Sequence, residues 1–349
     1  MKALEVHSDD PLCAGPSPED LITQYLTPNE LHYIRNHGPV PSVDGGAFRL
    51  EVGGLIDRPL ALSMDRLKAD FDRHSVVTTL QCAGNRRSEL HSVAPFEREV
   101  MWGGDAIGTA EWAGARLADV LRVANVAPTA THVWFDGLDR VMVSGTETSF
   151  GSSIDIIRAM NGDVLLAYEM NGEALPEVHG APLRVVIPGQ IGARSVKWLG
   201  RVTVADRPSG NHFQRVSYRV PTPADGETWQ PIQESHLNSF IVTPEDGARI
   251  KAGTVWIRGY AVPTGTSTIA EVDVSIDDAG WTPATLLDPL APGTWTRWQL
   301  SGELNSGEHE LRVRAGDSSG ARQTATLRDA WNPKGYSNGA IHTVRVHVE

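Results

Sequence analysis

Residues 80–87 of this chain, which read Leu80-Gln81-Cys82-Ala83-Gly84-Asn85-Arg86-Arg87, are the segment on which the fold assignment rests. The β-branched stretch before them, residues 75–80, predicts a strand, so Cys82 is expected where a strand passes into a glycine-containing turn. Functional side chains are often presented at such strand ends. Nearby positive charge favours the thiolate form of a cysteine, and a thiolate is a soft metal ligand. A lone cysteine is more often a buried, unreactive thiol; the two arginines and Asn85 argue against an apolar burial site here.

Length and composition describe an ordinary globular protein. The chain has 349 residues, enough for two domains with a large core, and 40% of them are hydrophobic. A formal net charge of −12 argues against nucleic acid as a partner. No apolar stretch is long enough to span a bilayer, so no membrane association is expected. Residues 1–20 do not resemble an export signal, and two cysteines far apart in sequence, Cys13 and Cys82, suggest no disulfide framework; both predict a cytoplasmic protein.

Hydrophobic periodicity and turn residues predict an α+β protein of two domains. Residues 1–30, rich in proline, serine and acidic residues, are expected to form an extended arm of a first, mixed α/β domain at 1–235. Helices are predicted at 64–71, capped by Ser63, at 115–126, and from Ser153 to residue 160. Short strands separated by turn residues, at 254–260, 271–276, 310–314 and 344–348, predict an immunoglobulin-like β-sandwich at 236–349. The boundary is expected within residues 221–239.

Positively charged residues are spread over several segments of the first domain. The loop 189–197 carries glycines and ends near Arg194 and Lys197, so its backbone N–H groups and cations could form an anion cradle. Arg35, Arg86, Arg87 and Arg184 could join them as a positive funnel within an acidic protein. By itself this pattern is weak, because many such loops are simply turns.

Other chemistries have little support in the sequence. It contains no HExxH, CxxC or GxSxG motif for zinc, c-type haem or a serine nucleophile. From the residues alone, Cys82 could also be a covalent nucleophile with His37 or His179 as its base.

The segment around Cys82 resembles the molybdenum-ligand segment of the sulfite oxidase family. Further segments resemble that family in the same order: 33–37 with its Arg-Asn-His sequence, 164–172, 179–180, 182–199 and 331–335. The resemblance runs from about residue 20 to the end. It implies a molybdopterin-binding first domain, followed by an immunoglobulin-like dimerisation domain that makes the protein a homodimer.

The resemblance also assigns roles to individual residues. Cys82 matches the protein ligand of a molybdenum that molybdopterin holds through its dithiolene (Moco). The residues that it implies for cofactor binding are Tyr33, Arg35, Asn36, His37, Asp139, His179, Arg184, Arg194, Ser195 and Lys197. For the substrate pocket it implies Arg35, Arg87, Trp102, Tyr218 and Lys334. Lys334 departs from the family pattern, since sulfite oxidases carry an arginine there; lysine keeps the charge but loses the planar two-point grip on an oxyanion.

The implied activity is oxidation of sulfite to sulfate by oxygen-atom transfer. The chain is expected to carry neither haem nor flavin, so two electrons would pass to an external acceptor, either oxygen or a separate redox protein such as a cytochrome. The alternatives are a molybdopterin nitrate reductase-like enzyme and a non-catalytic module that binds an oxyanion or a protein.

Overall fold

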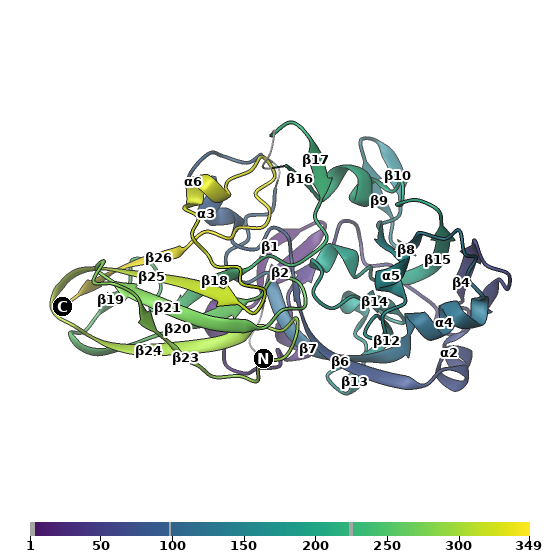
Figure 1. Ribbon diagram of the computed structural model, residues 1–349. Helices are drawn as coiled ribbons and strands as arrows, with labels where there is room; N and C mark the ends of the chain where they lie inside the picture. Colours follow the sequence, from purple (N-terminus) through teal and green to yellow (C-terminus); the bar gives the residue numbers. More distant parts are fainter. Residues whose placement is uncertain (1–3, 98, 223–225) are drawn as a thin grey trace.

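The computed structural model describes residues 4–97, 99–222 and 226–349, and Figure 1 shows two domains side by side. The first domain contains two five-stranded sheets. One sheet has the order β11 (Gly151–Asp155), β8 (His132–Gly137), β15 (Leu199–Ala205), β4 (Leu50–Gly54) and β5 (Leu60–Leu62), with only β15 and β4 parallel. The other has the order β13 (Glu173–Ala174), β12 (Leu165–Met170), β7 (Ile107–Arg116) and β6 (Arg73–Gln81), with β14 (Arg184–Val186) also on β12.

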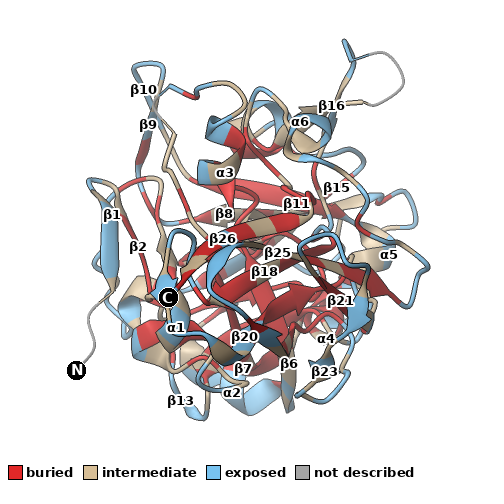
Figure 2. Cartoon of the chain, turned by 90° about the vertical axis from the view of Figure 1, so that its left-hand side faces the viewer, coloured by how far each residue is buried: buried red, intermediate tan, exposed pale blue. Residues whose placement is uncertain are grey.

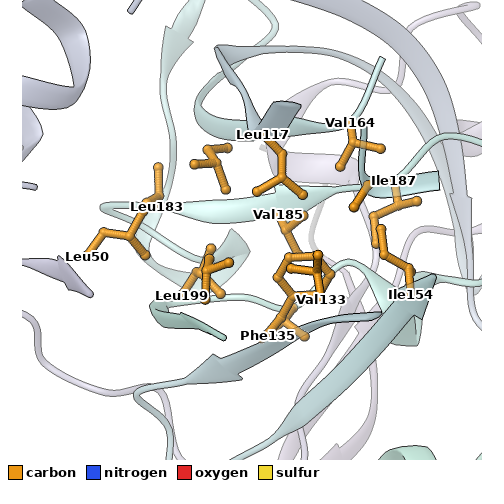
Figure 3. Packing of buried hydrophobic residues seen from close by; sticks show 14 of the residues in the cluster. Leu50, Leu117, Val133, Phe135, Ile154, Val164, Leu183, Val185, Ile187 and Leu199 are labelled. Carbon is orange, nitrogen blue, oxygen red and sulfur yellow. The ribbon is translucent and has the colours of Figure 1, made fainter. Parts of the chain in front are cut away.

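The core of this domain lies between the two sheets. Val133, Phe135 and Leu199 from the first sheet pack with Val185 from the second and with Leu117 of a helix, and all five are fully buried (Figure 3). Burial of a side chain of this size stabilises the fold by roughly 1.5–3 kcal/mol. The packing of the two sheets fixes the strand ends that carry the site described below.

The helices are short and lie around the sheets. Two helix predictions hold in part. Ser63 caps α2 (Met64–Asp70) by accepting a hydrogen bond from the Arg66 N–H, as predicted. The helix expected at 115–126 is α4 (Leu117–Ala124), which begins later because residues 115–116 still pair with β12. The remaining helices are α1 (Pro18–Leu21), α3 (Arg87–His91), α5 (Ile156–Ala159), α6 (Leu327–Ala330), the 3₁₀ turns η1 (Asn29–Leu31), η2 (Glu177–His179) and η3 (Gly192–Arg194), and the π-helical η4 (Phe213–Ser217).

Two expectations for local structure were wrong. Ser153 does not open a helix: it pairs with Trp134 inside β11, and the side chain of Asp155 caps α5 instead. The arm expected at residues 1–30 is a hairpin over its first part, β1 (Glu5–Asp9) and β2 (Leu12–Gly15), which pairs with β3 (Ile34–Arg35). Cys13 and Ala14 are buried against the domain, which gives this segment a folded position despite its polar composition. Residues 1–3 of the expected arm lie outside the described residues.

The second domain is a two-sheet β-sandwich, as predicted, and the α+β fold is confirmed. Its core includes Trp298, Leu311 and Val344, and Figure 2, in which this domain faces the viewer, shows buried residues along several of its strands. One sheet has the order β18 (Asn238–Thr243), β20 (Gly253–Val262), β24 (Thr296–Leu304) and β23 (Thr285–Leu286). The other has the order β19 (Arg249–Ile250), β26 (His342–Val348), β25 (Gly307–Asp317), β21 (Ile269–Ile276) and β22 (Thr282–Pro283).

Two hairpins complete the structure, β9 (Val141–Val143) with β10 (Thr146–Thr148), and β16 (Arg219–Pro221) with β17 (Trp229–Pro231). The domain boundary after residue 235 stays a prediction, and residues 223–225 of the stretch expected to contain it are not among the described residues. No described helix is both long and apolar enough to cross a membrane.

Candidate active site

A cavity in the first domain brings together segments that are far apart in the sequence. Counting its open mouth, its volume is about 670 Å³, which is in the range of cofactor and ligand sites. Its lining contains most of the predicted site residues: Tyr33, Arg35, Asn36, His37, Cys82, Asp139, His179, Arg184, Ser195, Lys197 and Tyr218.

Cys82 stands one residue beyond the end of β6, as the sequence predicts. Its backbone N–H donates to the carbonyl of Ala106 (2.9 Å), and the N–H of Gly84 donates to its Sγ (3.4 Å). Glycine at position 84 leaves room for the guanidinium of Arg87, which would lie 2.6 Å from a Cβ there and would have to shift. Burial raises the pKa of the Cys82 thiol, and the charges of Arg35 and Arg87 oppose that shift. The two arginines therefore favour the thiolate, as predicted, but burial has the larger effect on the pKa and favours the thiol.

Three cations, Arg35, Arg184 and Lys197, line the cavity, against one carboxylate, Asp139. Arg184 donates to the carbonyls of His179 (2.8 Å) and Ser195 (3.0 Å). Burial, together with the charge of Arg184, lowers the pKa of Lys197 well below its usual value. Burial also raises the pKa of Asp139. The cavity thus has an excess of cationic groups, and an anion bound there would stabilise their charged forms.

Several buried polar atoms at this cavity have no hydrogen-bond partner in the protein. They are Nδ2 of Asn36, Nε of Arg184 and Nε2 of His32. Buried donors of this kind are normally satisfied. Two of these atoms, Nδ2 of Asn36 and Nε of Arg184, can only donate, which suits an acceptor-rich ligand such as a phosphate.

Aromatic and histidine side chains form a second part of the lining. The Nε2 atom of His37 and the hydroxyl of Tyr218 share a hydrogen bond of 2.7 Å. Burial and the charges of Arg35 and Lys197 lower the pKa of His37 well below its usual range, so its ring is neutral. Burial raises the pKa of Tyr218, so the phenol keeps its proton.

The structure does not bring four predicted residues into the lining: Arg87, Trp102, Arg194 and Lys334. Trp102 is fully buried and meets Tyr33 edge-on at 6.3 Å, in the same apolar cluster as Cys82. Arg87 donates to the carbonyls of Val100 (2.8 Å) and Lys334 (3.2 Å). Lys334 is half-buried on the loop after α6 and contributes that carbonyl.

Arg194 has a structural position, contrary to its predicted place among the cofactor ligands. Its guanidinium donates to the carbonyl of Ile232 (2.6 and 2.9 Å) and to Oε1 of Gln214 (2.6 Å). It lies between two lining residues, Ala193 and Ser195, and the tight 3₁₀ turn of η3 points successive side chains in different directions, so Arg194 faces away from the cavity.

Some lining residues were not predicted. His32 lies directly before the Tyr33–His37 segment, and burial together with the charge of Arg184 lowers its pKa to about 3. Trp198 directly follows Lys197, and Phe150 stacks on His37 at a ring distance of 4.5 Å. His32 and Trp198 could have been predicted, because they are adjacent in sequence to the predicted residues Tyr33 and Lys197. Nothing in the sequence around Phe150 indicated that Phe150 lines the cavity.

The donor set fits the molybdenum cofactor. The cations and unpartnered donors of this cavity can bind a phosphate-bearing organic group, and the sulfur of Cys82 can bind a soft metal. Within the described ranges, no cluster of three or more His, Cys, Asp or Glu side chains could hold a metal ion without such a group.

Comparisons with known proteins agree with this geometry. Residues 37–213 match the family described as the oxidoreductase molybdopterin binding domain, and residues 229–349 match the Mo-co oxidoreductase dimerisation domain. Mitochondrial sulfite oxidase from Homo sapiens is 42% identical over 99% of this chain, and the chain spans 66% of its length. Sulfite oxidase from Arabidopsis thaliana is 36% identical over 99% of the chain and 94% of its own length.

A solved structure supports the same relationship. The sulfane dehydrogenase SoxCD from Paracoccus pantotrophus superimposes with a TM-score of 0.84, at 27% identity, over 98% of this chain and 87% of the other. Two matched domains in the same order, relatives that align over 99% of this chain and a cavity that contains Cys82 lead to one assignment. The chain belongs to the sulfite oxidase family of molybdopterin-binding oxidoreductases.

Proposed function

We propose that this protein is an enzyme that oxidises sulfite to sulfate at a molybdenum bound to Cys82. The observation that carries the proposal is the convergence of one buried thiol with the cations Arg35, Arg184 and Lys197 in a single cavity. Oxidation consumes one water: sulfite and water give sulfate, two protons and two electrons. The protein must therefore hold an anion, keep its polar groups correctly protonated, and release two protons and two electrons.

The lining residues divide into two groups by their donors. Arg184 and Asn36 would hold the phosphate and polar edges of molybdopterin, because each has a buried donor without a protein partner. Lys197 and His179 would complete this part of the lining, and a bound anion would stabilise the charged form of Lys197 that burial disfavours. The cofactor held by these residues would provide the oxygen-atom transfer and take up the two electrons. Arg35 would hold the substrate anion beside Cys82, since a guanidinium donates in parallel pairs to an oxyanion.

Tyr218 is suited to donate a hydrogen bond to sulfite. When the proton of neutral His37 is on Nε2, the ring donates to the Tyr218 oxygen across the observed 2.7 Å. The phenol proton is then free to point at a substrate oxygen. Because burial keeps the pKa of Tyr218 high, this donor persists through the neutral pH range.

The partners of the reaction form part of the proposal. The C-terminal domain, which matches a dimerisation domain, would join two copies of the chain. We propose a chain without haem or flavin that passes electrons to an external acceptor, oxygen or a redox protein such as a cytochrome. Its cytoplasmic location remains a prediction.

Steady-state kinetics with sulfite and with nitrate, together with metal analysis, test the proposal. We expect about one molybdenum per chain and turnover of sulfite with ferricyanide as acceptor. Nitrate reductase from Hordeum vulgare is 36% identical over 95% of the chain, so preferred turnover of nitrate would replace the proposal with that activity. Purified protein that binds oxyanions but contains no molybdenum would make it a binding module.

A further inference from the structure

A loop of the second domain contacts the Cys82 segment of the first. The N–H of Ser337 donates to the carbonyl of Ala83 (2.7 Å), and the side chain of Asn338 donates to the carbonyl of Arg86 (3.1 Å). Two residues that follow Cys82 are therefore held by the sandwich domain. Ser337 is preceded by an aromatic residue that the sequence analysis did not single out.

That side chain is Tyr336. It is 6% exposed, and its ring stacks on Tyr218 with a centroid distance of 5.4 Å and an interplanar angle of 20°. The other aromatic neighbours of Tyr218, His37 and Phe150, meet it edge-on, at 78° and 74°. The guanidinium of Arg87 lies 5.1 Å from the centre of the Tyr336 ring. One ring thus contacts two of the residues predicted for the substrate pocket.

The backbone around Tyr336 is fixed by Asn332. Its Oδ1 accepts from the N–H groups of Lys334 and Tyr336 (both 3.2 Å), and its Nδ2 donates to the carbonyl of Tyr336 (2.7 Å). Gly335 has φ +58°, and a Cβ there would lie 2.7 Å from Arg87. The loop therefore holds the Tyr336 ring in one place relative to Arg87 and Tyr218.

We propose that Tyr336, supplied by the C-terminal domain, is a positioning residue for substrate binding. Its ring fixes the Tyr218 phenol, whose hydroxyl faces the cavity, and holds the Arg87 guanidinium beside it. This inference rests on the proposed function, because Tyr218 is one of the groups proposed to hold sulfite. Stacked and cation–π contacts of this kind set orientation through the ring face, not through the Tyr336 hydroxyl.

The test compares Tyr336→Leu with Tyr336→Phe in the holoenzyme. Leucine keeps the apolar volume but removes the flat ring, so we expect KM for sulfite to rise about tenfold, with kcat changed less than about twofold. The dissociation constant of sulfate, measured by calorimetry, should rise by a similar factor. Phenylalanine keeps the ring, so Tyr336→Phe should match the native protein. Molybdenum content and Tm should stay at native values in Tyr336→Phe.

Phe96→Leu is the matched control. Phe96 is also buried beside Gly335, but its stacking partner is Trp331, at 6.1 Å, and not Tyr218. The inference is overturned if Tyr336→Leu leaves KM and sulfate binding unchanged, or if Phe96→Leu raises both equally. Should Tyr336→Leu not fold, Asn332→Ala must raise both values, and unchanged values would reject the inference. If native protein binds sulfate but does not oxidise sulfite, only the proposed function fails, since sulfate binding still tests Tyr336.

Discussion

Arg184 and Arg194 show how the same residue type takes different roles within one motif. Burial lowers the pKa of each guanidinium to about 10. Arg184 lines the cavity and has an unpartnered Nε, whereas Arg194 donates to Ile232 and Gln214. Arg184 donates to the carbonyls of His179 and Ser195 and keeps its Nε–H for a ligand, whereas Arg194 uses Nε and both terminal nitrogens within the fold.

Replacing each arginine by methionine should separate these roles. Arg194→Met leaves buried acceptors without donors and should lower the free energy of unfolding by about 3 kcal/mol. Arg184→Met leaves the carbonyls of His179 and Ser195 without these donors, so it should lower the free energy of unfolding by about 2 kcal/mol, and it should also remove most of the bound molybdenum. Urea unfolding and metal analysis measure the two effects. If the two variants lost the same stability and kept the same amount of molybdenum, the two arginines would not have different roles.

The sequence predicted the lining residues that lie in contiguous segments. Arg35, Cys82 and Lys197 were found because each sits in a motif whose strand end or loop also faces the cavity. The direction of Arg87 was not predictable, because the preceding residue adopts a left-handed conformation (Arg86, φ +64°). That turn directs Arg87 toward the loop of the second domain. Tyr336 was missed for a similar reason, since its importance comes from contacts between domains.

At the scale of elements, side-chain caps decide where short helices begin. Ser63 was predicted as the cap of α2, while Ser153 was mistaken for the cap that Asp155 provides to α5. Both Ser153 and Asp155 are cap-forming residue types, so local preference could not choose between them. The pairing of β11 with β8 keeps residues 151–155 in a strand, so the helix begins only after Asp155.

The cap of α2 can be tested without touching the cavity. Ser63→Ala removes the acceptor for the Arg66 N–H, so the free energy of unfolding should fall by about 1 kcal/mol. Ser63→Asp keeps an acceptor at this position and should retain native stability. Chemical denaturation measures both, and equal stabilities for Ser63→Ala and the native chain would show that this bond contributes nothing.

At the scale of the whole molecule, the two domains share buried polar contacts. Arg86 donates to the carbonyls of Ser239 (2.8 Å) and Ala340 (3.1 Å), and Asn85 donates to the hydroxyl of Tyr260 (3.1 Å). The turn spacing of the second half predicted the sandwich itself. It carried no information on how the sandwich sits against the Cys82 segment, because those contacts join residues that are 150 or more positions apart.

The same region makes stability depend on pH. His342 accepts a hydrogen bond from the Ile241 N–H (3.0 Å) and stacks on Phe240, and burial lowers its pKa to about 4. Its folded pKa is below the usual value near 6.5, so its contribution is complete above about pH 6.5. It is lost as the pH falls toward 4, by about 3 kcal/mol.

His342→Asn tests this contribution, since Asn keeps an acceptor but does not titrate. Between pH 6.5 and 4, the free energy of unfolding should fall in both proteins. The fall should be about 3 kcal/mol smaller in His342→Asn than in the native protein. Above pH 7 the two profiles should run parallel. Profiles that stay parallel down to pH 4 would remove His342 as a source of acid sensitivity.

X-ray absorption at the molybdenum edge of native protein and Cys82→Ser tests the central claim, that Cys82 binds the metal, most directly. Two sulfur ligands are expected from molybdopterin and one from Cys82. The native spectrum should therefore fit three sulfur ligands, and that of Cys82→Ser two, with a loss of turnover of at least about a thousandfold. The same number of sulfur ligands in both proteins, or native protein without molybdenum, would contradict the account.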